Sequence, residues 1–174
     1  MRRSTLTFGG KMVSAVQQAL SKLRTARSVD EGDGYADELA RAARQNLEEV
    51  IDLFYTTEVD TCALVWCLQG LTDDSVIDLF KDALKNKDSY VRWAAMEGLK
   101  HSSDRSLIPV FVAALKDRSH LVKAVAVEWL TSHGDSTAIG PLELLAKLPS
   151  MIKNSPGTVK QAEEAISLLR EKAT

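Results

Sequence analysis

The sequence predicts an all-α protein, a right-handed α-solenoid of about four stacked helical pairs. Within residues 75–147 the sequence repeats at an offset of 31 positions. Apolar residues recur at helical spacing through most of the chain, and no stretch shows sustained period-two alternation. Self-similarity at a period between about 20 and 50 residues is typical of stacked arrays. We therefore expect roughly eight helices and no sheet.

The repeat becomes visible when residues 75–99 are shifted forward by 31 positions. Apolar positions then coincide, together with one lysine and one glutamate. The matched pairs are Ile77 and Ile108, Leu79 and Val110, Phe80 and Phe111, Leu84 and Leu115, Lys85 and Lys116, Val91 and Val122, Ala95 and Ala126, Glu97 and Glu128, and Leu99 and Leu130. Each unit is interpreted as two helices joined by a turn, here Ser75–Lys85 and Ser89–Lys100, then Leu107–Lys116 and His120–Ser132.

Before the repeat, the pattern predicts a basic arm and a capping helix in residues 1–28. Apolar residues at helical spacing predict that helix at Met12–Ala26. Val29–Gly34 is rich in Asp, Glu and Gly and is expected to be a turn. A transit peptide or a membrane-surface helix are alternative interpretations of the start. We assign residues 29–174 to the solenoid, in a single domain overall.

After the repeat, the chain is expected to end irregularly. A first helix is predicted from Ala138 to Leu148, and prolines at 149 and 156 interrupt the pattern. Val159–Lys172 then has the spacing of a closing helix.

The composition fits a soluble globular protein in a reducing compartment. Of 174 residues, 45% are hydrophobic and 26% are charged. No apolar run approaches the roughly 20 residues that a membrane-spanning helix needs. Cys62 and Cys67 are five residues apart on one predicted helix, which is poor geometry for a disulfide. We therefore expect two small core residues and a cytoplasmic location.

Charge is unevenly distributed along the chain. Residues 1–28 hold six basic and no acidic side chains, so the remaining 16 bases and 24 acids give the rest a net charge of −8. An acidic body disfavours binding to phosphate backbones, although the basic start leaves nucleic-acid binding as an alternative. The same charge suits a basic protein partner through complementary fields.

One pattern carries a family resemblance over about Thr61–Lys147. The segment Asp88-x-x-Val91-Arg92-x-x-Ala95-x-x-x-Leu99, followed by Asp104, Ile108-Pro109 and Leu115, resembles HEAT repeats, especially the short variety named for phycobilisome lyases. The resemblance implies a stack of helical pairs in which Asp88 and Arg92 brace adjacent helices. One repeat later the corresponding residues are Ser119 and Lys123, so we expect the bracing to be incomplete.

Motifs for catalysis and metal binding are missing from the sequence. The hydroxylases among such solenoids need paired His-Glu dipeptides, but His101, His120 and His133 are each followed by another residue. There is also no GxGxxG, GxxxxGK[ST], CxxC or nucleophile elbow. We therefore predict no catalytic, cofactor-binding or metal-binding residues, and no enzyme. The resemblance alone suggests a bilin-lyase-like subunit as the alternative.

The second helix of each pair is expected to line a concave binding face. There we predict an apolar line, Leu68–Met96–Val127, beside an acidic line, Glu97–Glu128. The candidate protein-binding residues are Leu68, Gln69, Trp93, Met96, Glu97, Lys100, Val127 and Glu128.

Trp93 has two interpretations, because its repeat equivalents are Val65 and Ala124. It could pack against a neighbouring helix, or it could be an exposed aromatic anchor. The sequence therefore predicts a non-catalytic protein-binding module with a basic partner. An immunity protein that neutralises a basic toxin and a scaffold or assembly factor both fit.

Overall fold

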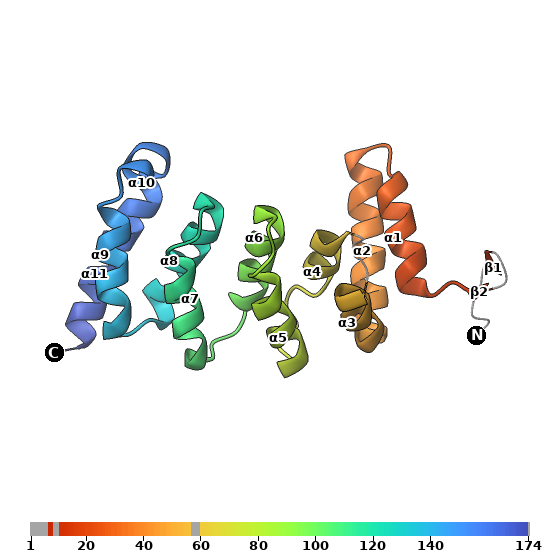
Figure 1. Ribbon diagram of the computed structural model, residues 1–174, viewed down its shortest axis with the longest axis horizontal. Helices are drawn as coiled ribbons and strands as arrows, with labels where there is room; N and C mark the ends of the chain where they lie inside the picture. Colours follow the sequence, from red (N-terminus) through yellow and green to blue (C-terminus); the bar gives the residue numbers. More distant parts are fainter. Residues whose placement is uncertain (1–6, 9–10, 57–59, 174) are drawn as a thin grey trace. The chain divides into compact units, whose positions relative to one another are not determined.

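The computed structural model describes residues 7–8, 11–56 and 60–173 and divides the chain into two compact units, Met1–Leu71 and Thr72–Thr174 (Figure 1). Nearly all of these residues that have regular structure are helical, which confirms the predicted all-α class. The unit boundary does not coincide with the expected division after residue 28. Within the described ranges, no helix is both long and apolar enough to cross a membrane.

The described residues of the first unit form a small hairpin and four α-helices. The hairpin pairs β1 (Thr7–Phe8) with β2 (Lys11–Met12) in antiparallel orientation and was not predicted. The remainder of the expected arm, residues 1–6 and 9–10, lies outside the described residues. The helices are α1 (Ala15–Thr25), α2 (Val29–Gln45), α3 (Leu47–Thr56) and α4 (Thr61–Cys67), and α2 packs against the other three.

The expected turn at Val29–Gly34 is wrong, because these residues form the first part of α2. Ser28 is the N-cap of this helix, and its hydroxyl accepts a hydrogen bond from the Glu31 N–H at 3.2 Å. Asp30 and Glu31 place negative charge at the positive end of the helix dipole. This capping offsets the low helix propensity of Gly32 and Gly34. These two glycines were the reason that the sequence predicted a turn here.

The second unit is built from helical pairs that stack in chain order. Its elements are α5 (Asp74–Ala83), α6 (Ser89–Leu99), the 3₁₀ turn η1 (Arg105–Leu107), α7 (Ile108–Ala114), α8 (His120–His133), η2 (Ser136–Ala138), α9 (Ile139–Ala146), α10 (Pro149–Asn154) and α11 (Pro156–Lys172). The pairs are α5 with α6, α7 with α8 and α9 with α11. The second helices also pack on one another, α6 on α8 and α8 on α11.

The prolines at 149 and 156 start helices in this unit. Each occupies the first turn, of α10 and α11 respectively, where the missing N–H would have had no intrahelical partner. The predicted irregular end therefore consists of an extra short helix between the two members of the last pair.

Two adjacent repeats fill the same core position in different ways. Phe80 and Phe111 are equivalent, and both are fully buried. In the first repeat, the Phe80 ring lies against Gly98, where an added Cβ would be 2.3 Å from the ring. In the second, Trp129 takes the place of Gly98 and stacks on Phe111 with ring centroids 4.0 Å apart. Its indole N–H donates to the Ser102 carbonyl at 2.9 Å, so its polar group is satisfied inside the core.

Arg92 joins two repeats, but through a different acid from the one expected. Its guanidinium donates to both carboxylate oxygens of Asp117, at 2.7 and 2.9 Å, and to the carbonyls of Asn86 and Lys87. Asp88 instead caps α6 by accepting from the Tyr90 N–H at 2.8 Å. The expected brace between Asp88 and Arg92 is therefore wrong. Arg92 pairs with Asp117, and the N-terminus of α6 binds the Asp88 carboxylate.

The contact between Arg92 and Asp117 is not repeated one helical repeat later. Lys123, the equivalent of Arg92, is also buried. Leu148 occupies the position of Asp117, and no ion pair of Lys123 occurs in the described part of the chain.

We expect Asp117→Ala to lower the free energy of unfolding by about 3 kcal/mol, because it leaves the buried Arg92 guanidinium without its counter-charge. Asp88→Ala is the matched control and should cost only about 1 kcal/mol, the usual loss of an N-cap. Urea unfolding of both variants measures the difference. A larger loss for Asp88→Ala would restore the brace expected from the sequence.

The contribution of this pair should fall in acid. Burial alone would raise the pKa of Asp117, but hydrogen bonds from Arg92 and from the Ser119 N–H, with the Arg92 charge, hold it below its ordinary value. A carboxyl whose pKa is lowered by folding stabilises the protein above its unfolded-state pKa and loses that effect as pH falls through the folded-state pKa. The stability difference between the natural chain and Asp117→Asn should therefore shrink on acidification.

We expect Gly98→Ala to lower the free energy of unfolding by about 1–3 kcal/mol, because the added methyl group overpacks the core at the Phe80 ring. Helix propensity alone would raise it by roughly 1 kcal/mol. Gly140 in α9 has open space around it, so Gly140→Ala is the control and should not destabilise. Thermal unfolding separates the two, and equal effects of both substitutions would contradict this account of the core.

Candidate protein-binding surface

The expected apolar line of the binding face is not exposed. Leu68, Met96 and Val127 are all fully buried. The reason is clear for α8, which packs against α6, α7 and α11 and so has three covered sides. Exposure of these three residues was therefore predicted wrongly, and they form no surface for a partner.

The charged residues of the predicted face do lie together at the surface. Lys100 follows the last turn of α6, and its Nζ lies 2.9 Å from Glu97 Oε2 and 3.3 Å from Glu128 Oε2 of α8. Glu128 is the most exposed of the three side chains, at 53%. We call Glu97, Lys100 and Glu128 the charged cluster.

Electrostatics hold the charged cluster in one arrangement. Burial alone would lower the pKa of Lys100, but the hydrogen bonds and charges of Glu97 and Glu128 outweigh it and keep that pKa above its usual value. The lysine therefore stays positive between two carboxylates. The expected acidic line is thus partly neutralised, with two negative charges around one positive charge.

Trp93 and Gln69 are half-buried. Trp93 precedes Glu97 by one helical turn and Lys100 by two, so the three share one side of α6. Gln69 follows α4 in the first unit. The two interpretations of Trp93 both stay open, and the binding role of Gln69 stays a prediction.

The net negative charge of residues 29–174 comes from one segment. Residues 29–71 hold ten acidic side chains and two basic ones, whereas residues 72–174 hold 14 of each. Any electrostatic preference of the second unit therefore arises from local clusters.

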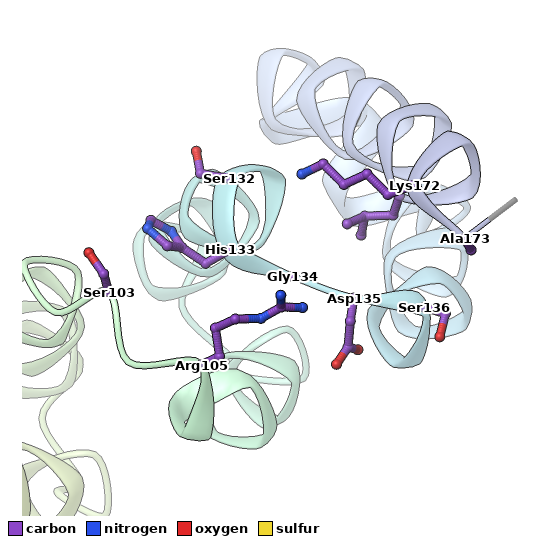
Figure 2. Close-up of a pocket in the computed structure, with 10 residues that line it drawn as sticks. Ser103, Arg105, Ser132, His133, Gly134, Asp135, Ser136, Lys172 and Ala173 are labelled. Atoms are coloured by element: carbon purple, nitrogen blue, oxygen red, sulfur yellow. The ribbon is translucent and has the colours of Figure 1, made fainter.

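A pocket of about 460 Å³ at the C-terminal end of α8 was not predicted. Its lining combines the loop before η1, the end of α8 with the residues that follow it, and the end of α11. Figure 2 shows the Arg105 guanidinium beside Gly134 and the Lys172 side chain extending from the end of α11 toward the end of α8, with Asp135 next to Gly134. Asp104 and Asp135, at equivalent repeat positions, cap η1 and η2 and so place these two loops at one end of the helices.

His133 forms one wall of this pocket as the outer ring of a stack. Its imidazole lies 4.7 Å from the Trp129 ring, and its Nδ1 is 3.2 Å from the Trp129 carbonyl oxygen, to which it donates. Because Asp135 accepts from the Thr137 N–H and hydroxyl, its carboxylate is held by η2. Among the described side chains of the pocket, no serine hydroxyl is hydrogen-bonded to His133. The lining of this pocket therefore carries mixed charge, from Arg105, Lys172 and Asp135.

Of the two cysteines expected in the core, Cys67 is a core residue and Cys62 is half-buried. Cys67 is buried, and its thiol donates to the Leu64 carbonyl at 3.0 Å. Burial raises the pKa of Cys67 to about 12, which leaves it as a neutral thiol at physiological pH.

Comparison with known proteins identifies one family. A family profile described as HEAT repeats matches residues 58–131 and 77–167. These matches together cover more than half of the chain and include both complete repeats of the second unit. No curated protein matches the sequence. The family match does not distinguish the short variety named for phycobilisome lyases, so that finer resemblance stays a prediction.

Proposed function

The chain belongs to the HEAT-repeat family, and we propose that it is a non-catalytic protein-binding module whose contact surface is the charged cluster with Trp93. Repeats of this kind commonly present the second helices of their pairs to protein partners. The observation that carries the proposal is the ordered group of Glu97, Lys100 and Glu128 on two successive second helices.

The chemistry of this surface favours a basic partner. Glu97 and Glu128 carry two negative charges against the single charge of Lys100. A guanidinium or ammonium from a partner can approach Glu128, the most exposed member of the cluster. Trp93, on the same side of α6, supplies an aromatic contact of the kind that dominates many interfaces. A cationic toxin neutralised by an immunity protein, or a basic subunit held by a scaffold, would both meet these requirements.

We expect the double variant Glu97→Gln/Glu128→Gln to bind the partner at least about tenfold more weakly, because it removes the charges that attract a cation. Affinity capture with the natural chain followed by mass spectrometry identifies the partner. Calorimetry with the purified pair then measures the dissociation constant over a range of salt concentrations. Trp93→Ala should also weaken binding while leaving the melting temperature nearly unchanged.

The control is Glu163→Gln/Glu164→Gln, which makes the same change of charge at exposed positions of α11. An equal loss of affinity in this control, or capture of an acidic partner that binds equally well to both double variants, would contradict the proposal. A large loss of stability in Trp93→Ala would assign that residue to helix packing.

A further inference from the structure

The turns within the helical pairs of the second unit lie along one edge of that unit. Figure 1 shows the connections from α5 to α6, α7 to α8 and α9 to α10 at the same ends of their helices. We call residues 84–90, 115–121 and 147–155 the turn edge. It is distinct from the charged cluster, because Lys100 lies at the opposite end of α6.

The turn edge is strongly basic within a unit of balanced charge. Its three segments contain six lysines and arginines but only two acids, Asp88 and Asp117. Both carboxylates are occupied, that of Asp88 by the N-terminus of α6 and that of Asp117 by Arg92 and the Ser119 N–H. Lys85 pairs with Asp82. The other five cations form no ion pair within the ranges that the structure describes, and all five are exposed: Lys87, Lys116, Arg118, Lys147 and Lys153.

A row of exposed apolar side chains follows the same edge at the repeat spacing. Tyr90, Leu121 and Ile152 are 61%, 47% and 55% exposed, and each is 31 positions from the next. The residues before Leu121 and Ile152 are also equivalent in the repeat, and they are in contact. His120 Nδ1 lies 3.2 Å from Met151 Sδ, which joins the start of α8 to α10. Large apolar side chains at equivalent positions of successive repeats form a row along the surface, unlike single exposed residues at unrelated positions.

A hollow connects the basic and apolar features. It has a volume of about 490 Å³ and lies between the starts of α6 and α8, where Lys87, Arg118 and Leu121 contribute to its lining. Arg92 also reaches this hollow, but its guanidinium is occupied by Asp117.

We propose that the turn edge binds an extended acidic peptide segment of another protein. The carboxylates of the segment pair with Lys87, Arg118 and Lys147, and its apolar side chains cover Tyr90, Leu121 and Ile152. Six bases against two occupied acids supply the charge complementarity. This inference concerns a different surface from the charged cluster and does not depend on the basic partner proposed there.

The spacing of the row predicts the pattern of the ligand. Packed helices are about 8–10 Å apart, and an extended peptide in the polyproline II conformation advances about 3.1 Å per residue and presents every third side chain on the same side. Apolar side chains at every third position of the segment would therefore meet successive members of the row, with acidic residues between them.

The side chains of the row favour a peptide over the other polyanions. Single-stranded nucleic acids bind mainly by stacking on aromatic rings, and two of the three row members are aliphatic. A bilayer surface would reach Tyr90, Leu121 and Ile152 but could not enter the hollow beside Arg118. A peptide can place a side chain in the hollow and cover the row at once.

The test uses the full chain and a fluorescein-labelled peptide, LDELDEL, with blocked ends. Fluorescence anisotropy at low salt should show saturable binding. The isomer LLLDEDE and the uncharged analogue LNQLNQL should bind at least about tenfold more weakly, because they lack the spacing and the charge respectively. The variant Lys87→Glu/Leu121→Ser should lose a similar factor for LDELDEL. Both of its substituted side chains are exposed, and circular dichroism verifies its fold.

The matched control is Lys160→Glu/Leu168→Ser, which makes the same changes at exposed positions of α11 and should bind LDELDEL like the natural chain. Equal binding of the three peptides, equal loss in the two double variants, or no saturation up to about 1 mM peptide would overturn the proposal. So would finding that the natural chain binds phosphatidylglycerol vesicles or a single-stranded oligonucleotide through Lys87 and Leu121 while LDELDEL does not bind.

Discussion

The contact between Arg92 and Asp117 is the constraint that fixes how the first two helical pairs of the second unit stack on each other. One buried guanidinium binds the carbonyls that end the α5–α6 turn and the carboxylate in the α7–α8 turn. Because buried charges require partners, this side chain fixes how far apart and in what register two neighbouring pairs can stack. The register in turn brings equivalent residues of successive repeats into rows along the surface.

Repetition explains how a unit with no net charge can have surfaces of opposite character. At one end of α6, Glu97 and Glu128 surround a single lysine. At the other, lysines and arginines recur in every turn, while the two acids present are used in capping and bracing. Because equivalent positions repeat the same kind of side chain, the turn edge acquires a basic surface that the summed charge of the unit does not reveal.

The helix pairs between residues 74 and 133 could be predicted because the 31-position offset fixes both the pairing and the turns. The burial of Met96 and Val127 could not, since the offset shows which residues are equivalent but not how many sides of a helix its neighbours cover. The start of α2 was missed because its glycines resemble a turn, whereas a serine cap and first-turn acids stabilise the helix. The bond partner of Arg92 also needed three dimensions, because Asp88 is nearer in sequence.

Gly98 and Trp129 show that the two central repeats are not interchangeable. Each residue is compatible only with the phenylalanine in its own repeat, one ring filling the space beside a bare backbone and the other lying flat against an indole. Exchanging α6 for α8 would force two rings into one volume or leave a cavity the size of a tryptophan side chain. The linear order of the repeats is therefore encoded in paired core residues, and a consensus array built by averaging them would lose that order.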